Sequence, residues 1–113
     1  MTTVAAWLAE RQPAPPAALV RRIREALGDS AEREATVAAD VCLAAGERLL
    51  ATVLGDEDAS RDYALDLLTA DALVTYAFEA ASETPGELAA RAARAMMNIA
   101  SLGAAAAATS SRL

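Results

Sequence analysis

The chain of 113 residues contains 32 alanines, ten arginines and one cysteine, has no lysine or histidine, and carries a net charge of −6. This length fits one domain. Without histidine and with a single cysteine, the chain lacks the ligands of a structural zinc site and the base of a Ser-His-Asp or Cys-His centre. The acidic balance argues against a nucleic acid or an anionic membrane surface as a partner.

The composition favours helices throughout. Alanine, leucine, arginine and glutamate are good helix formers, whereas Val, Ile, Phe, Tyr and Trp together supply only 12 residues. The N-terminal residues lack the basic and apolar regions of a signal peptide. The uncharged run between Arg94 and Arg112 is too rich in Ala and Ser for a membrane span. We therefore expect an all-α cytoplasmic protein, and the abundance of Ala and Arg without Lys suggests a bacterial source.

The first two expected helices flank a proline-rich connector. The first covers residues 3–11 and carries Trp7, which would dock either on the bundle or on a second subunit. Three prolines within residues 13–16 then form a stiff connector, because proline lacks the amide donor and restricts the residue before it. The second helix covers residues 16–27, where apolar residues recur at helical spacing, and Gly28 ends it.

The third expected helix is long and covers about residues 30–54. Asp29 and Glu32 have the spacing of a capping box at its start. Gly46 in its interior costs about 1 kcal/mol relative to alanine, and it predicts a close helix crossing. Cys42 lies on a mostly apolar stretch, where a buried and unreactive thiol is expected.

The fourth expected helix, about residues 60–82, follows a turn at residues 55–60. It holds the largest group of apolar side chains, on nearly all its sides, so it should lie at the centre of the bundle. With the third helix it should form a long antiparallel hairpin. Residues 84–87, Thr-Pro-Gly-Glu, have the pattern of a helix start. We expect a bundle of about five helices in a single domain over residues 1–103, followed by an Ala/Ser-rich tail over residues 104–113.

Three aspartates suggest a possible metal site. Asp58, Asp62 and Asp66 are four residues apart and would share one helix face, and clustered carboxylates can hold Mg²⁺. Acids are also common near helix starts, where the dipole favours negative charge. A metal site needs more converging ligands than these. We therefore predict no metal and no cofactor, and keep a metal-dependent enzyme as the third alternative.

A further aspartate, Asp71, lies among apolar residues of the fourth helix. Asp71 has Thr75 as its one polar neighbour on that face. A buried carboxylate needs hydrogen bonds or an arginine partner. We predict a buried polar network of Asp71 and Thr75 with Arg91 or Arg94 that ties two helices together. Catalysis or ligand binding at Asp71 is the alternative.

The candidate apolar site also lies on the fourth helix. The sequence places its aromatic and aliphatic side chains close to a methionine of the next helix, and the predicted pocket or interface consists of Leu73, Tyr76, Phe78 and Met96. Methionine lines flexible apolar surfaces as well as filling cores. Either use would give the apolar surface of this helix a role beyond folding.

The same helix carries a family resemblance. Asp71-Ala72-Leu73 followed by Ala77-Phe78-Glu79 resembles a helix of trans-polyprenyl diphosphate synthases, which often shows Gly-Asp-Ala-Leu-Leu and then Ala-Phe-Glu. The resemblance covers residues 65–100, and Ala70 stands where the family has Gly. It implies a related helical scaffold. The family's two aspartate-rich motifs and its basic diphosphate-binding residues are missing, so the resemblance implies no prenyl-transfer chemistry and no catalytic residue.

These observations predict a non-enzymatic structural or protein-interaction subunit. Apolar residues on more than one face of the hairpin favour self-association, because an oligomer would bury them. The expected partners are further copies of the chain or another protein, and neither nucleic acid nor a membrane. The alternative is a binder of an apolar small molecule or isoprenoid, in a pocket on the fourth helix.

Overall fold

The computed structural model describes the backbone of residues 1–55, 61–83 and 85–111, and the side chains of residues 1–55, 62–83, 89–90 and 92–107. Its elements, in chain order, are α1 (Val4–Ala9), α2 (Ala17–Leu27), two 3₁₀ turns at Gly28–Glu32 and Ala35–Val37, α3 (Ala38–Gly55), α4 (Arg61–Ala81) and α5 (Pro85–Ser111). The all-α prediction is confirmed. Among the described residues, no helix combines the length and apolarity needed to cross a membrane.

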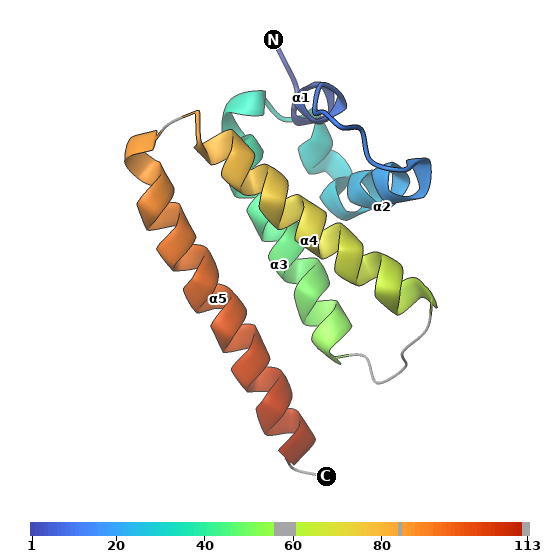
Figure 1. Cartoon of the computed structure of the whole chain (residues 1–113), viewed down its shortest axis with the longest axis vertical. Helices are drawn as coiled ribbons and strands as arrows, with labels where there is room; N and C mark the ends of the chain where they lie inside the picture. Colours follow the sequence, from blue (N-terminus) through green and yellow to red (C-terminus); the bar gives the residue numbers. More distant parts are fainter. Residues whose placement is uncertain (56–60, 84, 112–113) are drawn as a thin grey trace.

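The centre of the fold is the antiparallel pair of α3 and α4, as Figure 1 shows. Gly46 of α3 faces α4 at the crossing. A Cβ atom at this position would lie 3.1 Å from Cγ2 of Val74, 3.3 Å from the carbonyl oxygen of Ala70 and 3.3 Å from Cβ of Leu73. These distances are shorter than ordinary van der Waals contacts, so the two helices cross closely at residue 46, as the sequence predicted.

The main core lies where α1 and α2 cover one side of this pair. Leu73 of α4 is fully buried there, in a cluster with apolar side chains of α1, α2 and α3. The larger contributors are Val4 and Trp7 from α1, Ile23 and Leu27 from α2, and Val41 and Cys42 from α3. Burying a large apolar side chain contributes about 1.5–3 kcal/mol, so this cluster holds the N-terminal segments on the hairpin.

The third helix begins eight residues later than the predicted residue 30. The amide of Val4 donates to the carbonyl of Arg33 at 2.8 Å, and the amide of Ala35 donates to the carbonyl of Thr2 at 2.8 Å. These bonds hold Arg33 and Glu34 in extended conformations. The capping box predicted at Asp29–Glu32 is therefore wrong: this segment forms a 3₁₀ turn, and α3 starts only at Ala38.

Trp7 docks on the bundle of its own chain. Its side chain is 6% exposed, and its Nε1 donates a hydrogen bond to Oε1 of Glu83, just beyond α4, at 3.1 Å. The guanidinium of Arg11 stacks over the indole, 4.1 Å from its centroid. Such a stacked cation is stabilised by the electrons of the ring. The indole thereby connects α1 to the far end of α4.

The last helix flanks the hairpin and contacts both α3 and α4 (Figure 1). Its inward side chains recur with spacings of three and four residues and are Ala92, Ala95, Ile99, Leu102 and Ala106. The helix continues without a break from residue 103, where the sequence predicts the end of the domain, to residue 111. Alanine has the highest helix propensity, which accounts for the continued helix.

Replacing Gly46 with alanine should destabilise the protein relative to the same change at Gly103. Both glycines lie inside helices, so both variants gain about 1 kcal/mol of helix propensity. Nothing lies within 4 Å of a Cβ at Gly103, whereas at Gly46 it meets the backbone of α4. In urea unfolding, the free energy of unfolding of Gly46→Ala should be lower than that of Gly103→Ala by at least about 1 kcal/mol. Equal stability of the two variants would contradict the close crossing.

Candidate functional site

A small apolar cavity lies between α1, the proline connector and α2. It has a volume of about 140 Å³. We call it the α1–α2 pocket, and its main apolar walls are Leu8, Pro15, Val20, Ile23, Leu27 and Tyr76. Tyr76 is its one contribution from α4. The pocket exists because the connector turns the chain back, so that α2 comes to lie beside α1.

Two arginines and a phenol are the polar groups of the pocket. Arg11 and Arg24 line it together with Tyr76, and none of the described residues that line it is acidic. Burial raises the pKa of Tyr76 above its ordinary value; the charge of Glu79 raises it further, while Arg11 lowers it. The hydroxyl is therefore neutral at pH 7 and able to donate a hydrogen bond.

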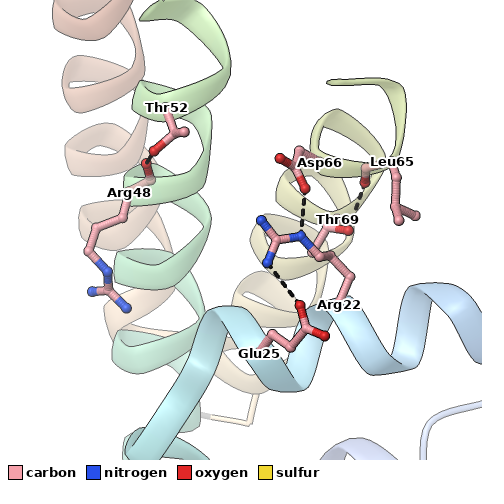
Figure 2. A network of polar contacts seen from close by, with 7 residues as sticks. All are labelled: Arg22, Glu25, Arg48, Thr52, Leu65, Asp66 and Thr69. Atoms are coloured by element: carbon pink, nitrogen blue, oxygen red, sulfur yellow. Dashed lines mark hydrogen bonds and ion pairs between the residues drawn. The ribbon is translucent and has the colours of Figure 1, made fainter. Parts of the chain in front are cut away.

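A charged pair joins α2 to α4 (Figure 2). Nε of Arg22 donates to Oδ1 of Asp66 at 2.6 Å, and Nη1 of the same arginine lies 3.2 Å from Oε2 of Glu25. We call the first contact the Arg22–Asp66 pair; its side chains are 29% and 18% exposed. The hydrogen bond to Asp66 raises the pKa of Arg22, against the opposing effect of burial. The guanidinium therefore stays protonated, so the pair holds two helices together and transfers no proton.

The threonine side chains near this pair bond to the backbone of their own helices. The buried hydroxyl of Thr69 donates to the carbonyl of Leu65 one turn earlier, at 2.7 Å. On α3, the guanidinium of Arg48 points away from the pair, while the hydroxyl of Thr52 donates to the Arg48 carbonyl at 3.1 Å (Figure 2). The two threonine hydroxyls in Figure 2 thus bond to the backbone of their own helices, the carboxylates of Asp66 and Glu25 bond to Arg22, and the Arg48 guanidinium points away.

The three aspartates of the possible metal site do not act as one group in the structure. Asp58 lies outside the described residues, Asp62 is exposed, and Asp66 is paired with Arg22. Within the described part of the chain, no three acidic or cysteine side chains are placed to share a metal ion.

The predicted buried network around Asp71 is wrong for the three of its four residues whose side chains the structure describes. Asp71, Thr75 and Arg94 are all exposed, and the Thr75 hydroxyl donates at 2.9 Å to the backbone carbonyl of Asp71, not to its carboxylate. The side chain of Arg91 lies outside the described residues. The inward face of α4 instead runs through the small and apolar residues Ala70, Leu73, Ala77 and Ala81, which turns Asp71 toward solvent.

The four residues of the predicted apolar pocket are not gathered around one hollow. Leu73 is fully buried in the core, whereas Met96 is 71% exposed. Phe78 is half-buried, and Tyr76 lines the α1–α2 pocket. Only the alternative use of these residues, an interface at Met96, is compatible with its exposure.

The single thiol is inaccessible. Cys42 is fully buried in the core between α3 and its neighbours. Burial raises its pKa from 9.0 to about 12. Since the thiolate is the reactive form, Cys42 is inert in the folded protein, as the sequence predicted.

Sequence reasoning missed the α1–α2 pocket. The connector was recognised, but which face of α2 would meet α1 depends on how the chain returns after residue 16. The sequence signal is the combination of apolar α2 residues with Arg24, and of α1 with Arg11 two residues beyond its end. Tyr76 belongs to the apolar site that the sequence predicts, whereas in the structure it lines the α1–α2 pocket.

Comparison of the chain with protein-family models, curated proteins and solved structures found no match. The residues that resemble polyprenyl diphosphate synthases are divided between two faces of α4. Asp71 and Glu79 are exposed, and Ala77 is buried against α3.

Removing Asp66 should destabilise the fold more than removing an exposed acid of the same helix. Asp66→Ala leaves a partly buried guanidinium without its charge-assisted hydrogen bond, so the free energy of unfolding should fall by about 1–2 kcal/mol. Asp71→Ala is the matched control and should change stability little, because its carboxylate is exposed. Urea unfolding at pH 7 measures both variants. A loss for Asp71→Ala as large as that for Asp66→Ala would show that the pair does not join the helices.

Alkaline pH should destabilise the protein through Cys42. Between pH 9 and 12 the unfolded thiol loses its proton while the folded thiol keeps it, so stability falls as pH rises through this window. The expected contribution is about 1.4 kcal/mol at pH 10. Unfolding measured at pH 8 and pH 10 should show a smaller loss for Cys42→Ala than for the wild type. The native thiol should also resist Ellman's reagent at pH 8, and rapid labelling would contradict its burial.

Proposed function

We propose that this protein is a non-enzymatic cytoplasmic subunit that self-associates, with α5 of one copy packed against α5 of another. The observation that carries this proposal is an exposed apolar stripe on the outer face of α5. Support for a non-enzymatic role comes from the chain's chemistry: it has no histidine, and its one thiol is buried.

The outer stripe has the spacing of a helix-pairing surface. Its members are separated by three or four residues, are all exposed, and are Ala90, Ala93, Met97, Ala100, Ala104 and Ala107. This is the heptad spacing of helices that supercoil around a partner. Met97 is 73% exposed, and its neighbour Met96 is 71% exposed. A methionine pair this exposed is a surface that burial in an oligomer would stabilise.

The dimensions of α5 favour a second copy as the partner. A helix of 27 residues is about 40 Å long and about 10 Å wide, so its outer face offers on the order of 400 Å². A stable interface takes about 800 Å² from each partner. The stripe alone therefore supports a weak dimer whose population depends on concentration. Small alanine side chains let the two helix axes approach closely, which raises the contact made per residue.

An antiparallel arrangement suits the charges. Arg94 lies in the N-terminal half of α5, and no acidic residue follows Glu87. In a parallel pair the two copies of Arg94 would approach each other and the helix dipoles would be aligned side by side. In an antiparallel pair Arg94 faces the alanine-rich half of its partner, and each helix start lies near the other's end.

A charge in the outer stripe should weaken the dimer. Met97→Glu places two carboxylates at the centre of the pairing surface, so it should shift the chain to monomer at concentrations where the wild type is dimeric. Sedimentation equilibrium, or size-exclusion chromatography with light scattering over a concentration series, measures this change. At least a tenfold increase in the dissociation constant is expected, equivalent to about 1.4 kcal/mol.

Ala64→Glu is the matched control, because it adds the same charge at an exposed position of α4. It should leave the dimer unchanged. Circular dichroism should show that both variants keep their helices. A wild type that stays monomeric at high concentration would refute the proposal, as would equal dissociation of the two variants.

A further inference from the structure

The α1–α2 pocket has the size of a single compact apolar group. Its volume is about 140 Å³, close to the roughly 150 Å³ of an apolar protein cavity that binds benzene. Pockets for drug-sized ligands are larger, at about 300–1,000 Å³. An occupant would therefore place one ring or a chain of about six carbons inside, and a long isoprenoid chain would not fit.

Both charged side chains among the described lining residues are cationic, Arg11 and Arg24, and the acid whose charge acts on the pocket is Glu79, through Tyr76. Nε of Arg11 donates to the carbonyl of Trp7 at 3.1 Å, and the guanidinium rests on the Trp7 ring, so its position is fixed before any ligand arrives. Its Nη2 lies 4.0 Å from the carboxylate of Glu10, beyond hydrogen-bond distance. Arg24 makes no ion pair with any described residue. Both guanidinium groups therefore have donors left for an anion.

Tyr76 adds a neutral donor to these two cations. Its side chain is half-buried in the wall of the pocket, and its hydroxyl makes no hydrogen bond with any described residue. Arg11 lines the same pocket, and its charge lowers the pKa of this hydroxyl against the larger, opposite effect of the Glu79 charge. A phenol beside a guanidinium is a suitable pair of donors for one carboxylate.

We propose that the α1–α2 pocket binds a small organic carboxylate, with its ring or short alkyl chain among Leu8, Ile23 and Leu27 and its carboxylate against Arg11, Arg24 and Tyr76. The apolar walls select for size, and the donors select for negative charge. None of the described residues that line this site belongs to α5, so the site is separate from the outer stripe.

Binding is tested with a series of probes of equal size and different charge. Benzoate and hexanoate should bind with a dissociation constant of about 1 mM or tighter, measured by isothermal titration calorimetry and by the fluorescence of Trp7, which lies under Arg11. Benzyl alcohol should bind at least tenfold more weakly, and benzylamine should not bind. Dodecanoate should bind no more tightly than hexanoate, because the added carbons remain outside the pocket.

Matched variants locate the site. Arg24→Gln should weaken benzoate binding several-fold, whereas Arg21→Gln, also exposed on α2 but outside the pocket, should not. Ala9→Leu should fill the pocket and abolish binding, whereas Ala6→Leu, exposed on the same helix, should leave it unchanged. Equal affinity for benzoate and benzyl alcohol would overturn the carboxylate assignment. The absence of saturable binding for every probe, or unchanged binding in Ala9→Leu, would overturn the site itself.

Discussion

The close contact of α3 with α4 at Gly46 sets the geometry on which the other elements depend. Because residue 46 lacks a side chain, the backbone of α3 rests against Ala70 and Leu73 of α4. Helices in such close contact gain dispersion energy along their length and lose it if they separate. The pair offers one side to α1 and α2 and another to α5, so both candidate surfaces are placed by this crossing.

Backbone hydrogen bonds and side-chain packing together position the N-terminal part. Residues 2–4 bond to residues 33–35, which holds α1 across the start of α3. Trp7 then reaches Glu83 beyond α4, and the proline connector brings α2 back beside α1. The α1–α2 pocket is the space left between two short helices that are fixed at their ends. Short helices have few inward side chains, so they leave such spaces more readily than long ones.

The two faces of α5 show how an alanine-rich helix can serve two contacts. Its inner stripe packs on the hairpin through Ile99 and Leu102, and its outer stripe presents Met97 among alanines. Both stripes have the same spacing, so periodicity alone does not tell which one faces the fold. The sequence placed Met96 at an apolar site together with Leu73, although the structure turns the two in different directions. Whether Met96 faces the core or the solvent depends on the rotation of α5 about its axis, where one residue corresponds to about 100°. Because most residues around α5 are alanine, the sequence does not determine this rotation.

The sequence by itself determined the helical class, the order of the helices, the close crossing at Gly46 and the burial of Cys42, because these follow from local propensity and apolar spacing. Helix ends marked by special residues were also predictable, such as the stop at Gly28, whose φ is +55°. Tertiary structure alone decided that α3 begins at Ala38, that Asp66 pairs with Arg22, that Asp71 faces solvent, and that Arg11, Arg24 and Tyr76 line one pocket. Each of these outcomes depends on contacts between residues far apart in the chain, and the energy of such contacts is absent from any local pattern.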